Sequence, residues 1–283
     1  MLFRSIALAT VLLAACAGGG GASTASPTPT ATPTPVLPDD PNALVIGVRQ
    51  EGGYVLREYL FARIPLVSVY ADGRVIVQGP QIESYPGPLL PSLVVAKLDE
   101  ATLLQLLESA QQAGLASGTN ASYPATSVAD APDTVFSVRS GAALTETSFG
   151  GLGSDLDDNK TPAEVEARRA AAAFLAELET IATSGEGAGP FVPAAVRLLV
   201  QDEVPQPDLP QQPVDWPLAS ALGSVGTPYF SGDPAGGRCL VVEGADLATL
   251  WPVLGAANAL TPFVSEGARF RDRKSTRLNS SHT

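Results

Sequence analysis

The residue types that perform most protein chemistry are scarce in this 283-residue sequence. It holds two cysteines, Cys16 and Cys239, and a single histidine, His282. A serine nucleophile needs a base beside it, and a zinc site needs a cluster of cysteine and histidine side chains. The sequence meets neither requirement and has no G-x-S-x-G motif. It therefore predicts no catalytic residues and no cofactor site, and it favours a protein that is not an enzyme.

Neighbouring carboxylates are the remaining candidates for acid–base chemistry. They form three pairs: Asp99/Glu100, Asp130/Asp133 and Asp202/Glu203. Each pair stands where we expect a helix cap, a turn or a strand end, positions at which Asp and Glu are common. An enzyme that uses such carboxylates therefore stays an alternative without a motif of its own.

The loop that begins at Asp155 has oxygen-bearing side chains at the intervals of a calcium site. Asp155, Asp157 and Asn159 alternate along the chain, and Glu166 occupies the twelfth position. This is the ligand spacing of an EF-hand loop, whose sixth position is a glycine. Lys160 stands at that position here, so calcium is the weaker of two interpretations.

The stronger interpretation of the same residues is the start of a helix. Thr161 suits the N-cap, Pro162 suits the first helical position, and Glu164 suits the third position of a capping box. We therefore expect a helix from Pro162 to about Thr183, and no metal is required to order its beginning.

The first fifteen residues have the parts of a bacterial signal peptide. Residues 6–13 form an apolar core after one arginine, and this core is shorter than the roughly 20 apolar residues of a membrane span. The sequence Leu13-Ala14-Ala15-Cys16 resembles the bacterial lipobox. The resemblance implies that residues 1–15 are removed and that Cys16 receives a diacylglyceryl group. The protein would then be lipid-anchored on the extracytoplasmic face of the cell membrane; an ordinary secretory signal is the alternative.

Residues 16–42 are expected to tether the lipid to the folded region. The stretch 18–41 consists mostly of Gly, Ala, Ser, Thr and Pro. Such a segment cannot bury a core and is expected to be disordered or to form polyproline II. At about 3.1 Å per residue in its Pro-rich part, it would hold the folded region tens of ångströms from the bilayer.

The end of the chain is expected to have a different origin. Residues 272–282, DRKSTRLNSSH, match the translation of a common sequencing-library adapter. We therefore interpret residues 272–283 as an artefactual tail, and not as a basic arm that binds nucleic acid or membranes. His282 belongs to this tail, so the natural part shown has no histidine. We also expect the natural chain to continue beyond Arg271.

The remaining residues, 43–271, are expected to form the folded region. Hydrophobic residues make up 45% of the whole chain and charged residues 16%, as in a packed protein. The formal net charge is −12, which argues against nucleic acid as a partner. Cys239 has no second cysteine in this region, and two interpretations stay open. It is a small buried side chain, or it forms a disulfide with a partner missing from this chain.

Local patterns predict two successive hairpin-then-helix units between residues 43 and 185, after a first strand at 44–49. Asp72-Gly73 separates two β-rich runs at 66–70 and 74–78, a combination typical of a tight hairpin turn. A helix follows, with Asp99 as its N-cap and Gly114 at its end. Its apolar stripe is expected at Leu103, Leu106, Leu107 and Ala110.

The second unit repeats this order. Strands at 134–138 and 142–149 flank a Ser140-Gly141 turn, and the helix from Pro162 follows, with an apolar side at Val165, Phe174, Leu175, Leu178 and Ile181. We therefore predict an α+β fold in which each antiparallel hairpin is followed by a packed helix.

A second α+β subdomain is predicted for residues 186–271, truncated at its end. Strands are expected at 195–201, 238–242 and from 267 to Arg271, and Asp246 is expected to cap a helix that Pro252 kinks or interrupts. Core packing is the expected role of the aromatic residues here, with a ligand groove as the alternative: Trp216, Tyr229, Phe230 and Trp251.

Residues 66–78 together with 98–115 resemble small domains of uncharacterised function in bacterial secreted proteins and lipoproteins. This resemblance implies a fold type and no activity. With the anchor and the missing catalytic groups, it favours a non-enzymatic binding or envelope-structural module. Its ligand would be a protein, an envelope polymer or a small molecule. Pro-rich connectors at 80–91 and 205–217 leave protease inhibition by a rigid loop as another alternative.

Overall fold

The computed structural model describes residues 34–125, 129–154, 160–184, 187–229, 237–273 and 276–277. All of these residues belong to one compact unit. Cys16 and three of the calcium candidates, Asp155, Asp157 and Asn159, lie outside the described residues. Among the helices that are described, none combines the length and the apolar character needed to cross a membrane.

Strand β1 (Leu44–Glu51) lies inside an eight-stranded sheet and joins the two predicted hairpins. On one side it pairs with β2 (Val67–Tyr70), and on the other side with β6 (Asp133–Ser140). The strand order is β5-β7-β6-β1-β2-β3-β4-β8, antiparallel except for the β5–β7 pair. The other strands are β3 (Arg74–Gln78), β4 (Leu93–Lys97), β5 (Ala121–Tyr123), β7 (Ala143–Gly150) and β8 (Gly189–Pro190).

The predicted Asp-Gly turn connects β2 to β3. The amide of Gly73 donates to the carbonyl of Tyr70 at 2.8 Å, and Gly73 has a φ of +86°. A Cβ atom at this position would lie 2.3 Å from the carbonyl oxygen of Leu98. Glycine is therefore required twice, for the positive φ and for the close approach of the chain that leads into the next helix.

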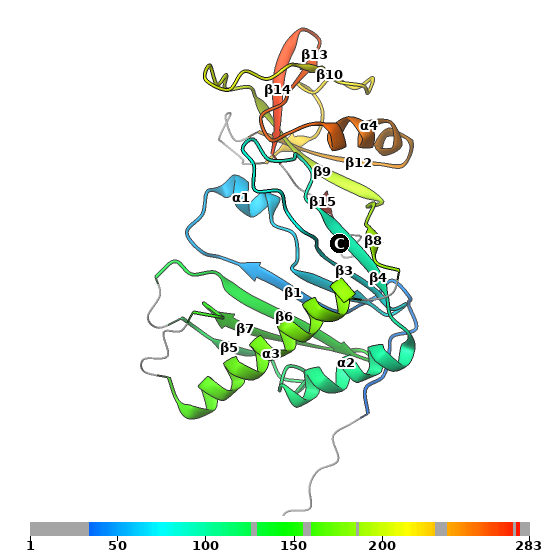
Figure 1. The fold of residues 1–283 in the computed structure, drawn as a ribbon, viewed down its shortest axis with the longest axis vertical. Coiled ribbons are helices and arrows are strands. Elements are labelled where there is room, and N and C mark those ends of the chain that lie inside the picture. The colour runs from blue at the N-terminus through cyan, green and yellow to red at the C-terminus, as the bar shows by residue number, and fades with distance from the viewer. Residues whose placement is uncertain are drawn as a thin grey trace, which may run out of the picture. The chain divides into compact units, whose positions relative to one another are not determined.

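Helices α2 (Glu100–Gln112) and α3 (Pro162–Ser184) cover the same face of this sheet (Figure 1). Asp99 caps α2 as predicted, because its carboxylate accepts from the amide of Thr102 at 2.7 Å. The predicted apolar stripe is confirmed, since the following four side chains are all buried: Leu103, Leu106, Leu107 and Ala110. They form one core with apolar side chains of the first sheet and of α3.

The predicted start of α3 is also confirmed. The amide of Glu164 donates to the hydroxyl of Thr161 at 3.2 Å, and the helix begins at Pro162. Glu164 itself binds Arg168, with 3.1 Å between Oε1 and Nε. Of the predicted apolar side, Phe174 and Leu178 are buried, and the other three residues are half-buried: Val165, Leu175 and Ile181.

Arg168 is a buried residue that the sequence analysis did not single out. Its guanidinium donates to the carbonyl of Gly150 at 2.9 Å and to those of Tyr123 and Pro124 at 2.9 and 3.1 Å. With Glu164 as its ion partner, the buried charge has hydrogen-bond acceptors on several sides. Arg168 thereby attaches α3 to the ends of β5 and β7.

A second sheet follows residue 194 and has the order β10-β13-β14-β9-β12-β11. Its strands are β9 (Ala195–Asp202), β10 (Val214–Asp215), β11 (Thr227–Pro228), β12 (Arg238–Glu243), β13 (Pro262–Ser265) and β14 (Ala268–Arg273). Apolar side chains of this sheet and of α4 (Gly244–Ala256) form a core separate from the first. Trp216 and Trp251 pack against this core, as predicted.

The prediction that Asp246 caps α4 is wrong. The helix begins at Gly244 directly after β12, with Glu243 at the N-cap and Asp246 in the first turn. Gly244 has a φ of +61°, which lets the chain turn from strand to helix without an intervening loop. Asp246 is still favourably placed, because carboxylates in a first turn interact well with the helix dipole. Pro252 lies inside the helix and does not interrupt it.

Helix α1 (Arg57–Ala62) packs against the second sheet through Phe61. The guanidinium of Arg197 on β9 lies over the Phe61 ring, 4.4 Å from its centre, and donates to the Phe61 carbonyl at 3.0 Å. Tyr229 meets the same ring edge-on at 4.8 Å. The amide of Leu89 also donates to the carbonyl of Ala257 at 3.0 Å. These contacts join the part of the chain that precedes residue 90 to the second sheet.

Packing begins before the predicted tether boundary at residue 43. The amide of Gly141 donates to the carbonyl of Val36 at 2.6 Å, and Leu37 packs against the first core. At the other end, β14 continues to Arg273, and β15 (Thr276–Arg277) pairs with β9. Backbone pairing is available to any residue, so it does not bear on the adapter match. Asp272 adds a residue-specific contact, because its carboxylate accepts from the amide of Leu199 at 2.9 Å.

The α+β prediction is confirmed, with both hairpins and both helices that were predicted between residues 43 and 185 in place. Strand β8 extends the first sheet to residue 190, past the predicted boundary at 185/186. The division into two subdomains stays a prediction. The sequence analysis missed one helix, α1, and several strands: β4, β5, β8, β10, β11 and β13.

The core between the first sheet and α2 is expected to carry much of the stability. Leu106→Ala, at a position 1% exposed, should lower the free energy of unfolding by about 2–5 kcal/mol, because it leaves a cavity under the helix. Leu144→Ala removes the same atoms at a position 45% exposed and should change it by about 0.5 kcal/mol or less. Chemical denaturation measures the free energy of unfolding of both variants. Equal losses would mean that this core does not hold the sheet.

Candidate functional site

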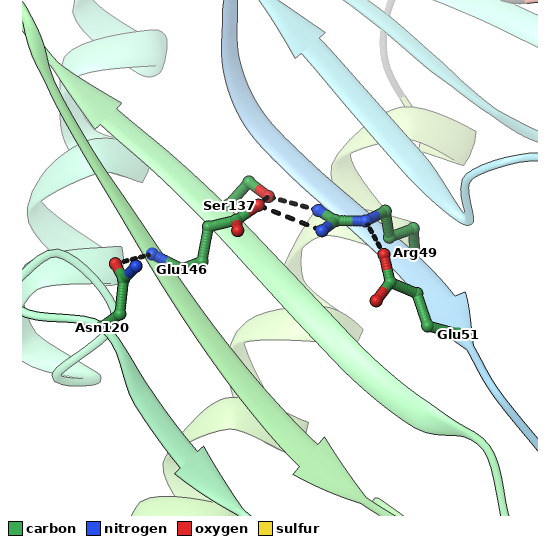
Figure 2. A network of polar contacts seen from close by, with 5 residues as sticks. All are labelled: Arg49, Glu51, Asn120, Ser137 and Glu146. Atoms are coloured by element: carbon green, nitrogen blue, oxygen red, sulfur yellow. Dashed lines mark hydrogen bonds and ion pairs between the residues drawn. The ribbon is translucent and has the colours of Figure 1, made fainter.

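The first polar group of interest lies on the face of the first sheet that α2 and α3 leave open. Figure 2 shows Arg49 of β1 between two carboxylates, with Glu51 Oε1 2.6 Å from Nε and Glu146 Oε1 3.0 Å from Nη2. Ser137 accepts from Nη1 at 2.6 Å and donates to Glu146 at 2.9 Å. The strand alternation puts Ser137 on this face, since its neighbours Phe136 and Val138 belong to the core under the helices.

The charges of this network support one another. The hydrogen bond from Ser137 is the main cause that lowers the pKa of Glu146, and Arg49 adds to it against the effect of burial. Burial opposes the charge of Arg49, but hydrogen bonds and attraction to Glu51 and Glu146 outweigh it and raise the pKa of Arg49. Asn120 completes the network by accepting from the Glu146 amide at 2.9 Å. The arrangement cross-links β1, β6 and β7, so its evident role is to hold strands together.

A cavity of about 170 Å³ beside the second sheet has a different character. It is lined by residues 203–207 and 209–211, by Leu260, and by Arg269 and Arg271. We call it the arginine cavity. The Pro-rich connector after β9 forms one wall, and β14 supplies the two arginines.

The alternation of β14 explains why both arginines reach the cavity. Phe270 is 8% exposed and belongs to the second core, so its neighbours Arg269 and Arg271 lie on the opposite face. Arg271 stands opposite Gln201 of β9 in the ladder, and the amide of Glu203 donates to the Arg269 carbonyl at 3.2 Å. Glu203 is thereby held next to the arginine pair.

The ion pair inside the arginine cavity is long, and its arginine side chain is exposed. Arg269 Nη1 lies 3.4 Å from Glu203 Oε2, and the Arg269 side chain is 52% exposed whereas that of Glu203 is 15% exposed. An exposed ion pair of this length contributes little stability. The residues that line the cavity include two guanidinium groups and one carboxylate.

Backbone and amide hydrogen bonds order the Pro-rich wall. The amide of Leu209 donates to the Gln206 carbonyl at 3.0 Å, and the Gln211 side chain donates to the Leu209 carbonyl at 3.1 Å. Asn258 donates to the Gln211 side chain at 2.7 Å and ties the loop to the end of α4. Prolines within the loop restrict its backbone further. These contacts therefore fix the conformation of the cavity wall.

The chemistry of the arginine cavity is that of recognition. Guanidinium groups stay protonated and donate fixed pairs of hydrogen bonds that match carboxylate and phosphate geometry. They do not exchange protons near neutral pH. Across the described part of the chain, no group of three His, Cys, Asp or Glu side chains is placed to hold a metal ion.

The candidate residues that the structure describes lie in separate surroundings. Glu166, the described calcium candidate, lies exposed on α3 and pairs with Arg169 at 2.7 Å. Cys239 lies half-buried in β12, between Thr227 and Leu199 in the ladder. Of the aromatic candidates, Trp216 meets Phe263 edge-on in the second core, Tyr229 packs on Phe61, and Phe230 lies outside the described residues. Trp216 and Tyr229 thus lie in two separate aromatic contacts.

Comparisons with known protein families, with curated proteins and with solved structures found no match. Sequence reasoning missed Arg269 and Arg271, although two arginines at i and i+2 in a predicted strand must share a face. That signal was present in the strand expected from residue 267.

The polar network predicts a pH dependence of stability. Glu146→Gln removes a carboxylate whose folded-state pKa lies below its ordinary value of 4.5. Its contribution is present at neutral pH and is lost as the pH falls through the lowered pKa. The unfolding temperature of the wild type should therefore exceed that of the variant at pH 7, and the gap should shrink below pH 4.5. Because the side chain is 40% exposed, solvent screening keeps the gap small.

The control for this comparison is Glu166→Gln, in an ion pair whose two side chains are about 70% exposed. It should show a gap near zero at every pH, as is usual for exposed ion pairs. Thermal unfolding followed by circular dichroism between pH 3 and pH 7 measures both variants. A Glu146→Gln gap that widens on acidification would contradict the assignment.

Proposed function

We propose that this protein is a lipid-anchored extracytoplasmic binding protein. Cys16 attaches it to the membrane, and the arginine cavity binds a small ligand or one group of a larger one. The observation that carries the binding function is the cavity itself, in which Arg269 and Arg271 face an ordered Pro-rich wall. Polar groups that converge on a hollow with some apolar lining residues are usual features of a ligand site.

The anchor rests on the sequence around Cys16. An apolar core, two small residues and a cysteine follow one another at the spacing of a lipobox. Two acyl chains would hold the protein stably, since a single chain gives only marginal membrane binding. The Pro-rich residues that follow Cys16 place the folded region at a distance from the bilayer.

Binding accounts for the cavity better than catalysis does. Arginine is suited to orienting an anion, whereas a general acid or base must change its protonation state near the working pH. Glu203 is the one carboxylate in the cavity, and Arg269 pairs with it. The acidity of the chain as a whole disfavours nucleic acid as the partner.

Replacement of the anchoring cysteine tests the location. Cys16→Ser should abolish lipidation, because a hydroxyl does not replace the thiol that accepts the diacylglyceryl group. The variant should move from the detergent-rich to the aqueous phase in detergent phase partition. Mass spectrometry should find no lipid-modified peptide that begins at residue 16.

Cys239→Ser is the matched control, since it removes the other cysteine and leaves the anchor. It should partition with the wild type and carry the same lipid mass. If Cys16→Ser stays in the detergent phase as fully as the wild type, Cys16 is not the anchor, and this part of the proposal fails.

A further inference from the structure

We infer that an exposed apolar surface around α1 docks onto the lipid bilayer that holds the anchor. Five side chains form this surface, which we call the α1 patch: Tyr54, Val55, Leu56, Tyr59 and Leu60. The inference rests on the lipid anchor of the proposed function and adds a second, non-covalent contact with the same membrane.

The α1 patch concentrates exposed apolar side chains in a short segment. In the described part of the chain, five of the thirteen exposed large hydrophobic side chains fall between residues 54 and 60. Tyr54 is 87% exposed, Leu56 is 64% exposed and Tyr59 is 59% exposed. Single apolar residues are common on the surface of soluble proteins, whereas a contiguous group marks a surface that binds a protein or a membrane.

The geometry of α1 puts three of these side chains on one face. The amides of Tyr59 and Leu60 donate to the carbonyl of Leu56 at 2.9 and 3.4 Å. Residues three and four positions apart in a helix share a face, so Leu56, Tyr59 and Leu60 lie together. Phe61 lies on a different face, where it is 1% exposed and packs under the guanidinium of Arg197. Because Phe61 faces the second sheet, the patch is left on the outside.

Hydrogen bonds fix the chain on both sides of the α1 patch. Before it, the amide of Tyr54 donates to the carbonyl of Asp130 at 3.2 Å. After it, Nη1 of Arg63 donates to the carbonyl of Gly52 at 2.6 Å. Together with the burial of Phe61, these contacts prevent the patch from turning inward. Its exposure is therefore a property of the folded state.

The residue types of the α1 patch suit a membrane interface. Tyrosine is enriched at the level of the lipid headgroups, and leucine is typical of segments that lie in the interface. A standard protein interface takes about 20–30 residues from each partner, many more than this patch offers to a second copy. The net charge of −12 gives no attraction to anionic lipids, so the contact depends on apolar burial.

The anchor makes a weak contact sufficient, and the tether is long enough to allow it. Val36 contacts Gly141, beyond the Ile46 end of the β1–β6 pair, whereas the patch follows Glu51 at the other end. Strand β1 is roughly 25 Å long at about 3.3 Å per residue. Residues 16–33 would span roughly 55 Å at about 3.1 Å per residue. This span is the largest distance that the tether allows, and within it the patch has a high effective concentration at the bilayer.

The test places a tryptophan in the α1 patch of the full, lipidated chain. Tyr59→Trp is reconstituted into phosphatidylcholine vesicles whose acyl chains carry bromine, which quenches tryptophan on contact. After subtraction of the wild-type signal from Trp216 and Trp251, its fluorescence should be at least twofold lower than in vesicles without bromine. Leu144→Trp is the matched control, because Leu144 is 45% exposed on β7, away from α1 and close to the Gly141 turn. Its fluorescence should change little.

A carboxylate in the α1 patch should abolish the quenching. Leu56→Asp, added to Tyr59→Trp, should restore the fluorescence, because a charged group resists transfer into the acyl region. Leu144→Asp makes the same charge change at the control position and should leave the quenching unaltered. Both positions are exposed, so circular dichroism should show an unchanged fold in both variants. High salt should also leave the quenching unaltered, since it screens only charge attraction.

Flotation of the vesicles separates this inference from the proposed anchor. A chain that floats with the vesicles while Tyr59→Trp stays unquenched would overturn docking and leave the anchor in place. A chain that does not float would overturn both. Equal quenching of Tyr59→Trp and Leu144→Trp would also overturn docking, because no preferred face would then meet the bilayer.

A second copy of the chain is the competing occupant of the α1 patch. Analytical ultracentrifugation of the full chain with Cys16→Ser should find a monomer. A dimer that Leu56→Asp dissociates and Leu144→Asp does not would overturn docking and assign the patch to self-association.

Discussion

The packing of two helices against the middle of the first sheet is the contact on which the rest of the structure depends. Strand β1 pairs with both hairpins, and Ile46 and Val48 on it are completely buried in the core under α2 and α3. Without this apolar face, the two hairpins would share only the backbone ladder of β1. The opposite face of the same strands carries the polar network around Arg49, which aligns β1, β6 and β7 and adds little burial. Burial on one face and hydrogen-bonded charge on the other are what an antiparallel sheet of this kind requires.

In the second sheet, the alternation of side chains between the two faces of β14 forms the arginine cavity. Phe270 anchors β14 in the second core, and this fixes Arg269 and Arg271 on the outer face. The Pro-rich connector then has to cross in front of them, and Asn258 holds it there through Gln211. The arginine cavity is therefore a consequence of strand register and of one ordered loop. It lies apart from the aromatic contact of Phe61 with Arg197, through which α1 meets the second sheet.

Local signals predicted the elements that local chemistry determines. The Asp72-Gly73 turn, the Asp99 cap and the leucine stripe of α2 each depend on a few neighbouring residues, and all three are present. Strands such as β10 and β11 are two residues long and are defined by pairing with a neighbouring strand. They are too short to show a periodic pattern that would predict them. Asp246 was misplaced because Gly244 starts α4 without a loop. The arginine cavity depends on the pairing of β14 with β9 and on a distant asparagine, which sequence spacing alone does not reveal.

The most direct test of the account is a map of where a small organic anion binds. Backbone amide and arginine side-chain resonances of the chain with Cys16→Ser would be followed by NMR as a small organic anion, pentanoate, is added. The account predicts that the largest shifts fall on residues 203–211, on Leu260 and on β14, with the Arg271 guanidinium among them. Shifts centred instead on the open face of the first sheet, or on α2 and α3, would contradict the assignment of the arginine cavity as the binding site.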